Sequence, residues 1–414
     1  MAKLQSVRGT HDLIGDEARA HIAIADTARD VAGRYGFGPM ATPIFELTDV
    51  FQRTLGDTSD IVTKEMYTFE DKGGDSLTLR PEGTAGIARA FISGGLQNEL
   101  PLKCFYHGPM FRHERPQKGR LRQFHQIGVE LIGVADPAGD VEVIALAADT
   151  LDALGILSGT TLELNTLGDS ESRDRYRAVL VEYFNAHLGS LSQDSQERLT
   201  RNPLRILDSK SPEDREIVAS APVFDDYLTD AAAKFFGKVC RGLDVLGIGY
   251  KLNPRLVRGL DYYGHTAFEF TTETLGAQGT VLAGGRYDGL IKTMGGPPTP
   301  GVGWAAGVER LSMMVEGPVA RARPVTLIGL GEAGENAALS LSRELRQSGL
   351  TVELIYKGGL KRGLKRADRI NAASAILIGD DELAKGLATV RDLDSGEQVE
   401  VALSDLKDHL AAHR

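Results

Sequence analysis

The residues best suited to chemistry lie within 108–133, GPMFRHERPQKGRLRQFHQIGVELIG. Five cations fall within eleven residues of this stretch, against the single acid Glu114: Arg112, Arg115, Lys118, Arg120 and Arg122. An arginine presents a planar fork that pairs with two phosphate oxygens at once. The stretch therefore predicts a phosphate-binding site, although a solvated basic turn on a surface hairpin accounts for the same residues about equally well.

Two strands joined by a basic loop are the simplest elements that could position these side chains. Apolar residues alternate with others from Gln126 to Ile132, which is the period of a strand packed on one face. Pro116 and Gly119 punctuate the middle and would break a helix. The second strand would then hold Gln126 and Glu130 beside the guanidinium groups, where a small polar molecule could bind.

A junction between a strand and a helix is the next candidate, in LTLRPEGTAGIARAFI at 77–92. The strand is expected to end at Arg80-Pro81, and Glu82 and Thr84 fall near the start of the helix. Free backbone N–H groups at a helix start attract acids and hydroxyls, so these two side chains either cap the helix or face a ligand.

The composition is that of a globular protein: 414 residues, 42% of them hydrophobic, enough for two or three domains. No apolar run approaches the ~20 residues that span a bilayer, and the N-terminus lacks the apolar core of a signal peptide. A cytoplasmic location without membrane attachment is therefore the default. Cys104 and Cys240 are the only cysteines, which excludes a disulfide framework and a four-thiolate zinc site.

A formal net charge of −10 argues against broad attraction to nucleic acid, but positive charge is concentrated locally. Besides the first basic loop, the stretch 357–369, KGGLKRGLKRADR, carries six cations against Asp368 alone. A polyanion that grips both patches would bind less tightly as salt rises. Two solvated faces are the plainer alternative.

Strand and helix patterns divide the chain into two parts. Strand-like segments stop near 168, a mainly helical stretch occupies about 170–250, and strand-like segments resume up to about 315. We interpret the helical stretch as an insertion between strands of one sheet. After a linker at 321–324, the last ~90 residues alternate strands and helices as a small βαβ-type layer.

Two further patterns carry less weight. Residues 329–334 spell the dinucleotide-binding fingerprint G-x-G-x-x-G, but a tight strand-to-helix turn explains them better in so short a unit. The spacing of His107, His113 and His125 matches none of the usual zinc patterns, so no zinc-type protein ligands are expected.

Several separated segments resemble one family in the same order. The stretch 108–128 resembles the second signature motif of class II aminoacyl-tRNA synthetases, PGVGWAAGVERL at 300–311 resembles the third, and 42–69 resembles the first. LVRGLDYY at 256–263 and AGGRYDGL at 283–290 are similar to the two signatures that set the histidyl-tRNA synthetase family apart. RGTHDL, NPLRILDSK and the C-terminal unit also resemble that family, so the resemblance covers nearly the whole chain.

This resemblance implies a fold and a reaction. The fold would be α+β, with a class II catalytic domain at 1–321 on a mainly antiparallel sheet, interrupted by the helical insertion, and an α/β anticodon-binding domain at 322–414. The reaction would join L-histidine to its tRNA through histidyl-adenylate, with ATP as substrate and Mg²⁺ bridging its oxygens. Members of the family are homodimers built through the first motif, and the same is expected here.

Roles at the phosphates carry over from the matching motifs. Arg112 matches the arginine that meets the α-phosphate, and Arg310 matches the one on the γ-phosphate side. Arg258 matches an arginine that lies near the histidine carboxylate and the α-phosphate. Glu114 would contact adenine or magnesium. The resemblance therefore assigns catalysis to the three arginines, mostly through positioning and electrostatics.

An imidazole pocket needs an acceptor and a donor facing each other, because a neutral imidazole has one N–H and one bare ring nitrogen. Glu130 and Tyr263 match the family's pair for this purpose. Other residues expected along the histidine pocket are Glu82, Thr84, Gln126 and Tyr287. Residues expected to bind tRNA are Arg115, Gln117 and Arg122 at the acceptor end, with Lys361, Arg362 and Lys365 on the anticodon side.

Two rival functions fit parts of the same pattern. A regulatory paralogue would keep the fold and bind histidine without charging tRNA, but such proteins generally lack the C-terminal unit and erode Arg258 or Arg112. A synthetase for proline or threonine is disfavoured by LVRGLDYY and Glu130. Small departures from the family pattern occur at Gly264-His265 and at Trp304, and His265 puts substrate affinity in doubt.

Overall fold

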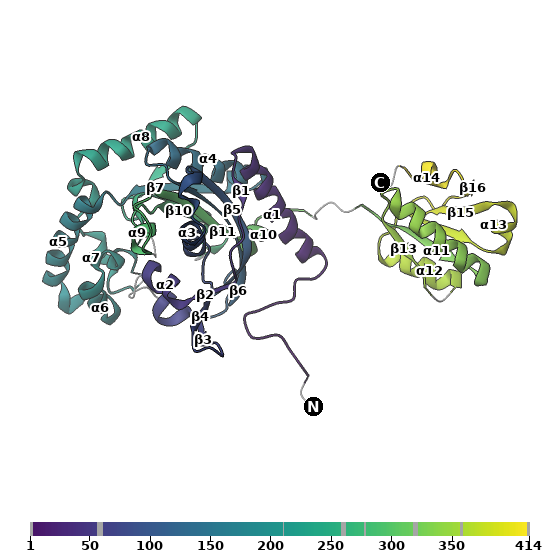
Figure 1. The fold of residues 1–414 in the computed structure, drawn as a ribbon, viewed down its shortest axis with the longest axis horizontal. Coiled ribbons are helices and arrows are strands. Elements are labelled where there is room, and N and C mark those ends of the chain that lie inside the picture. Colours follow the sequence, from purple (N-terminus) through teal and green to yellow (C-terminus); the bar gives the residue numbers. More distant parts are fainter. Residues whose placement is uncertain are drawn as a thin grey trace. The chain divides into compact units, whose positions relative to one another are not determined.

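The computed structural model describes residues 3–55, 61–209, 211–257, 262–276, 279–317, 322–356 and 359–411. Two compact units divide the chain, Met1–Pro318 and Val319–Arg414 (Figure 1). Each unit has a hydrophobic core of its own, so each can be understood by itself.

An eight-stranded sheet forms the centre of the first unit. Its strands pair antiparallel except at the two edges, where β1 and β8 run parallel to their neighbours. In spatial order the strands are β1 (Gly38–Pro39), β5 (Leu102–Phe111), β6 (Gln123–Ile132), β11 (Gly301–Gly307), β10 (Thr280–Arg286), β9 (Gly264–Thr271), β7 (Thr161–Thr166) and β8 (Lys251–Leu252). The expected pair of strands around the basic loop is confirmed as β5 and β6.

Two different cores cover the two faces of this sheet. On β6 the side chains of Ile127, Val129 and Leu131 join the larger core, which α1 (Asp16–Arg34), α4 (Pro137–Ala153), α8 (Asp230–Leu246) and α10 (Val308–Ser312) complete. The intervening residues face the other way, where Ile132 joins a smaller core with α3 (Thr84–Ser93) and α9 (Leu290–Thr293). Because side chains alternate along a strand, β6 presents Gln126 and Glu130 on this second face.

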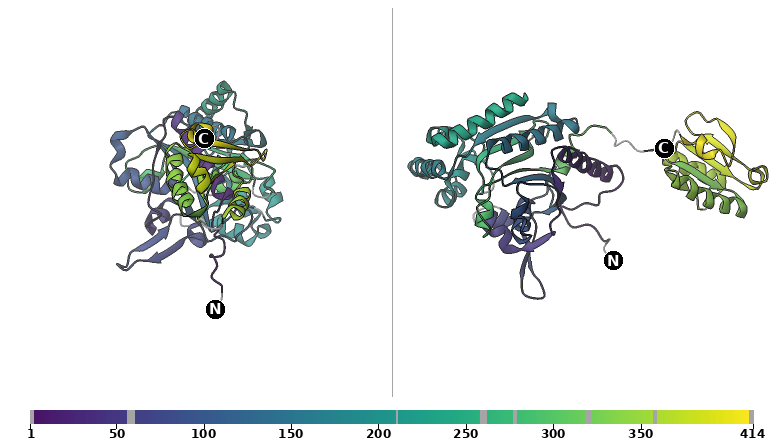
Figure 2. Two further views of the ribbon diagram at one scale, coloured as in Figure 1. Left: turned by 90° about the vertical axis from the view of Figure 1, so that its right-hand side faces the viewer. Right: turned by 45° about the horizontal axis from the view of Figure 1, so that its top comes forward.

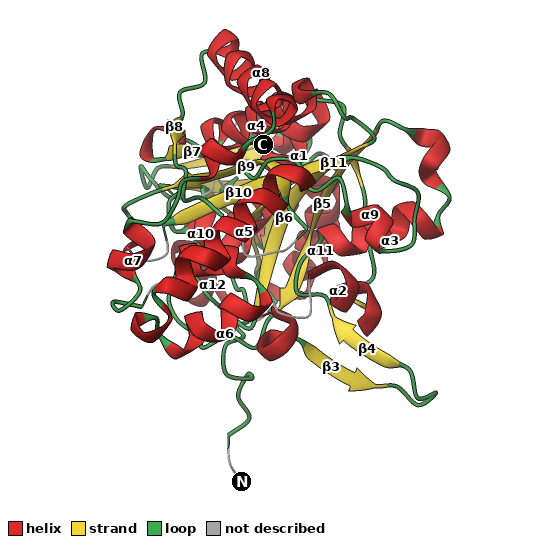
Figure 3. Cartoon of the chain, turned by 90° about the vertical axis from the view of Figure 1, so that its left-hand side faces the viewer, coloured by secondary structure: helices red, strands yellow, loops and turns green. Residues whose placement is uncertain are grey.

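Helices between β7 and β8 form the insertion: α5 (Ser170–Ala186), α6 (Gln193–Arg201), α7 (Arg215–Ala219) and α8 (Figure 3). A separate core around Tyr176, Leu180, Phe184 and Phe224 holds this region together. Asp169 caps α5 by accepting from the Ser172 backbone N–H at 2.8 Å. The insertion therefore starts with a well-defined helix terminus directly after a strand.

A small sheet of three strands lies beside α2 (Thr48–Leu55), in the order β2 (Phe45–Leu47), β4 (Ser76–Leu79) and β3 (Tyr67–Glu70). Its β3–β4 hairpin projects away from the rest of the unit (Figures 2 and 3). One face of the sheet, with Glu46 and Thr78, is buried, and the other face is open.

In the second unit three parallel strands are followed by two antiparallel ones: β13 (Val352–Leu354), β12 (Val325–Gly329), β14 (Ser374–Ile378), β15 (Leu387–Asp392) and β16 (Gln398–Ala402). Its helices are α11 (Gly331–Gln347), α12 (Gly359–Arg369), α13 (Asp380–Lys385) and α14 (Leu406–His409). The glycine fingerprint serves close packing here, since a Cβ at Gly334 would collide with the carbonyl oxygen of Ile378. In the described residues of both units, no helix is long and apolar enough to span a membrane.

Candidate active site

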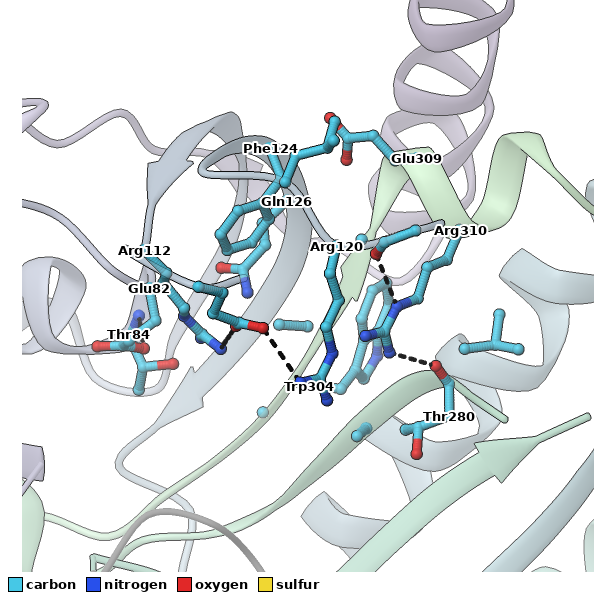
Figure 4. A pocket seen from close by; sticks show the side chains of 18 of the residues that line it. Glu82, Thr84, Arg112, Arg120, Phe124, Gln126, Thr280, Trp304, Glu309 and Arg310 are labelled. Atoms are coloured by element: carbon cyan, nitrogen blue, oxygen red, sulfur yellow. Dashed lines mark hydrogen bonds and ion pairs between the residues drawn. The ribbon is translucent and has the colours of Figure 1, made fainter. Parts of the chain in front are cut away.

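One cavity of about 210 Å³ opens on the second face of the large sheet. That is several times the roughly 30 Å³ that a water molecule takes up in the liquid, so a small molecule fits inside. Side chains from β6, β10, β11 and α10 line it, together with the basic loop 112–122 and the junction before α3 (Figure 4). Segments that are far apart in the sequence thus meet at one place, as the phosphate-site prediction requires.

Three arginines converge on one side of the cavity. The Nε of Arg112 donates to the Pro81 carbonyl at 2.9 Å, and Nη1 of Arg310 donates to the Thr280 carbonyl at 2.8 Å. Arg120 also lines the cavity, and sequence reasoning had given it no role. Burial, followed by repulsion from Arg120, lowers the pKa of Arg310, which shows how closely the cations are crowded.

Glu114 is the acid that lies among these arginines. One oxygen of its carboxylate lies 3.1 Å from Arg120 Nη1, and the other lies 3.9 Å from Arg112 Nη1. Of the other two acids that line the cavity, Glu82 caps α3 and Glu309 bonds His125. The three guanidinium groups are therefore concentrated around Glu114, where a polyphosphate would be attracted.

The Glu130 carboxyl group is buried next to two residues that line the cavity, Thr84 and Gly303. Thr84 Oγ1 donates to one of its oxygens at 2.6 Å, and the Tyr287 hydroxyl donates to the other at 2.5 Å. Burial raises the pKa of Glu130 to about 8, against the opposing effect of these two hydrogen bonds. A Cβ on Gly303 of the neighbouring strand would collide with this carboxylate, so glycine is required there.

The sequence left open whether Glu82 and Thr84 cap the helix or face a ligand, and the two residues turn out to differ. Glu82 caps the helix, because its oxygens accept from the backbone N–H groups of Thr84 and Ala85, both at 2.7 Å. Thr84 instead uses its hydroxyl to hold Glu130, and both residues line the cavity. Burial raises the pKa of Glu82 although Arg112 opposes the shift.

Buried polar atoms without a hydrogen-bond partner among the described residues point to a ligand. The Gln126 Oε1 is one of them, and Gln126 lines the cavity. The Trp304 Nε1 is a second, but this ring packs in the larger core on the other face of the sheet. The hydroxyl of Tyr106 is a third, in the core that also contains Tyr263 and Tyr287. An unpaired buried polar group costs about 1–3 kcal/mol, which a substrate that bonds to it would offset.

The remaining expected residues lie in three places. Tyr263 lines the cavity beside Tyr262, with ring centroids 4.6 Å apart. Arg258 lies outside the described residues. Arg115 and Gln117 are exposed on the basic loop, while the half-buried Arg122 donates from Nε to the Glu114 carbonyl at 3.3 Å. On α12 of the second unit, the exposed residues are Lys361, Arg362 and Lys365.

A mainly antiparallel sheet, a basic hairpin between two of its strands and an arginine from a following helix are the features of the class II aminoacyl-tRNA synthetase fold. The histidyl-tRNA synthetase family model matches residues 9–311, and the anticodon binding domain model matches residues 324–413. The chain therefore belongs to the histidyl-tRNA synthetase family, and the expected α+β fold is confirmed.

Curated relatives and solved structures agree with this family. Histidine--tRNA ligase of Rhodospirillum rubrum is 63% identical over 412 residues, which cover 99% of both chains. The enzyme of the same name from Gluconacetobacter diazotrophicus is 58% identical over 411 residues, again 99% of both chains. The apo histidyl-tRNA synthetase of S. aureus matches with a TM-score of 0.83 and 33% identity, over 98% of this chain and 99% of that one.

Proposed function

We propose that this chain joins L-histidine to its cognate tRNA in two steps, by forming histidyl-adenylate from ATP and then transferring the histidyl group. The observation that carries this proposal is the convergence of Arg112, Arg120 and Arg310 on one cavity that Thr84, the partner of the buried Glu130, also lines. Cations and a buried carboxyl thus meet at one space that would hold the two substrates.

Adenylate formation is assigned to the arginines. The histidine carboxylate attacks the α-phosphorus of ATP and pyrophosphate leaves, so negative charge must be stabilised at both the α-phosphate and the leaving group. Arg112 would stabilise the α-phosphate, and Arg310 would hold the γ-phosphate. Arg258 would align the histidine carboxylate with the α-phosphate, a role taken from its place in LVRGLDYY.

Magnesium would bridge the phosphate oxygens and neutralise part of their charge. Glu114 suits this ion, because its carboxylate lines the cavity between Arg112 and Arg120 and is not used to cap a helix. Glu82 is less suited, since backbone N–H groups of α3 occupy both of its oxygens.

Selection of histidine is assigned to Glu130 and Tyr263 on two sides of the ring. A carboxylate has about four lone-pair directions, so Glu130 can accept the imidazole N–H while it keeps its bonds from Thr84 and Tyr287. Gln126, with a buried oxygen that has no partner in the described structure, would accept from the ammonium group. Apolar analogues would leave these groups unpaired and bind poorly.

Contacts with tRNA are proposed on both units, with 1–321 as the catalytic domain and 322–414 as the anticodon-binding domain. Arg115 and Gln117 are exposed on the loop next to the cavity and would meet the acceptor end. On the second unit, a depression lined by Arg362 and Lys365 also contains Tyr356, which is 79% exposed. Cations beside an exposed aromatic ring favour single-stranded bases through charge and stacking.

A homodimer built through the small sheet is also proposed. Six apolar side chains share the open face of this sheet, as the pairing of its strands shows, and all are at least partly exposed: Phe45, Leu47, Tyr67, Phe69, Leu77 and Leu79. A partner would cover such a patch. The stretch 42–69 that resembles the first motif contains four of its six residues, Phe45, Leu47, Tyr67 and Phe69. The cytoplasmic location expected from the sequence stays a prediction.

Amino-acid-dependent exchange of pyrophosphate into ATP tests the proposal with each of the twenty amino acids. Histidine alone should support exchange, and exchange with proline or threonine would contradict the assignment of the pocket. An Arg258→Ala protein should fold but exchange about 10- to 100-fold more slowly, since a charge-assisted contact contributes about 1.5–3 kcal/mol. Arg175→Ala, which changes an exposed arginine paired with Glu171 on α5, is the control; equal rates for both variants would remove the role of Arg258.

A further inference from the structure

At the edge of the cavity, which Glu309 lines, three ligand-bearing side chains meet that the proposed reaction does not use. They are His21 on α1, His125 on β6 and Glu309 on α10. One nitrogen or oxygen atom from each residue can be chosen so that all three lie within 4.8 Å of one another. Arg310, the neighbour of Glu309, points toward Thr280 in the cavity, whereas Glu309 points toward the strand that carries Phe124 (Figure 4).

The pair of His125 and Glu309 is already arranged as a metal-binding histidine and its carboxylate usually are. Glu309 accepts from the His125 backbone N–H at 2.9 Å and contacts the ring Nδ1 at 2.9 Å. A carboxylate that bonds one ring nitrogen fixes the tautomer and leaves the other nitrogen as a free lone pair.

His21 supplies an independent sign of a missing ligand. Its side chain is only 6% exposed, and its Nδ1 has no hydrogen-bond partner among the described residues. The rings of His21 and His125 are 5.5 Å apart and nearly perpendicular. Burial is the largest cause that lowers the pKa of His21, which favours the neutral ring that can donate a lone pair.

We propose that His21, His125 and Glu309 form a site for a divalent transition-metal ion of the Zn²⁺ class. Two imidazoles and one carboxylate are a donor set that zinc prefers, at about 2.0–2.2 Å from the metal. His107 on β5 is exposed, and its ring lies 6.2 Å from that of His125, so it or a water molecule would take the fourth position.

Such an ion would join α1, β6 and α10, three elements that come from distant parts of the chain. His125 lies between Phe124 and Gln126 in the sequence, and Glu309 lies next to Arg310. Phe124, Gln126 and Arg310 line the cavity, so the ion would fix the backbone that carries them. Its role is therefore to hold the site in place and not to react. Spacing along the sequence could not reveal these ligands, because zinc patterns describe residues that share one local segment.

Zinc binding to the purified full chain tests this inference, in buffer that contains neither histidine nor tRNA. The chain is first stripped with a chelator and then titrated with Zn²⁺ against a chromophoric competitor. One equivalent should bind, and His21→Gln should weaken that binding at least ~100-fold, because it removes a direct ligand. His187→Gln is the matched control, since His187 lies in the insertion with its Nδ1 bonded to the Tyr183 carbonyl.

Thermal unfolding provides a second readout that separates a metal site from a merely structural histidine. Stoichiometric Zn²⁺ should raise the Tm of the native chain and of His187→Gln, but not that of His21→Gln, because a ligand stabilises only the state that binds it. Zinc affinities that are the same in the native chain and His21→Gln overturn the proposal. Absence of a Tm shift in the native chain does so as well. Since the readouts are metal affinity and Tm, either result leaves the proposed ligase activity untouched.

Discussion

A carboxyl group as deeply buried as that of Glu130 makes the stability of the free protein depend on pH. Its pKa is about 8 in the folded chain and 4.5 in the unfolded one, so between these values the folded state holds the extra proton. The free energy of unfolding should therefore fall as pH rises from about 5 to 8, by at most about 5 kcal/mol. Urea unfolding of Glu130→Gln should show a flatter dependence, while Glu171→Gln, at an exposed site, should follow the native curve. If the free energy of unfolding depends on pH in the same way in Glu130→Gln and in the native chain, the raised pKa of this buried carboxyl is contradicted.

The same substitution separates histidine binding from ATP binding. Glu130→Gln keeps the shape of the side chain but replaces a carboxylate acceptor with an amide. The KM for histidine in pyrophosphate exchange should rise about 10-fold or more, since a buried group that loses its hydrogen-bond partner costs about 1–3 kcal/mol. The KM for ATP should change much less, because the hydrogen bonds of Glu130 go to Thr84 and Tyr287 and not to the arginines. An unchanged KM for histidine would show that the ring is held elsewhere.

Arg120 gives a further prediction for the phosphate end of the cavity. Its guanidinium group lies 3.1 Å from Glu114 and crowds Arg310. Arg120→Ala should raise the KM for ATP and slow exchange about 10- to 100-fold, the effect of one lost charge-assisted contact. Arg175→Ala on α5 serves as the control for loss of an exposed arginine. If the two variants have the same kinetics, Arg120 is only a partner of Glu114.

Sequence analysis predicted the types of residue at the site better than it predicted which individual residues line it. Five cations in eleven positions predict a phosphate site, but only the fold shows that Arg120 turns into the cavity while Arg115 remains exposed. Tyr106 was missed for a similar reason, because a tyrosine inside a strand is far more often ordinary core than a ligand contact. Its position in the strand places it on the same face as Glu130, and this alternation was the one signal that could have found it.

At the scale of elements, the basic loop is held by contacts at several points. Arg122 donates its backbone N–H to the carbonyl of Gly9 in the N-terminal segment at 2.8 Å, and Arg310 donates to the carbonyl of Gly119 at 3.3 Å. Pairing of β5 with β6 was predictable from their alternation, because period 2 is a local property of the sequence. The contact of residues 3–14 with the loop was not, since that segment has no regular structure and no periodicity.

Gly9 offers a test of this contact. It has a φ of +88°, and a Cβ there would meet Arg122 Cγ at 2.8 Å and Pro116 Cγ at 2.9 Å. Gly15 also has a positive φ, +64°, but a Cβ there would meet nothing within 4 Å. Alanine at either position should cost about 1–2 kcal/mol of backbone strain, whereas only Gly9→Ala should slow aminoacylation, several-fold, by displacing the loop. The steady-state rate of aminoacylation and the Tm are measured for both variants. Equal rates of aminoacylation would show that the contact with Gly9 does not position the loop for the reaction.

At the scale of the whole molecule, folding of the single chain leaves an apolar surface open, and a partner would cover it. Hydrophobic cores and two compact units account for most apolar side chains. The domain boundary expected between 321 and 322 from the linker stays a prediction. The open face of the small sheet was not predicted in this form. Strand alternation there is too short, at three or four residues a strand, to say which face meets the core and which meets a partner.

That open face yields the last prediction. Leu47 is 54% exposed on β2 beside Leu77 of the central strand, and a dimer would bury it. Leu47→Glu would place a charge in the interface, where burying an unpaired carboxylate costs several kcal/mol, so sedimentation should show a monomer at concentrations where the native chain is a dimer. Val245→Glu, at an 86% exposed position on α8, should remain dimeric. Because Leu47 is already exposed in a single chain, its substitution should leave the circular dichroism of the monomer unchanged, and a dimeric Leu47→Glu protein would place the interface on another surface.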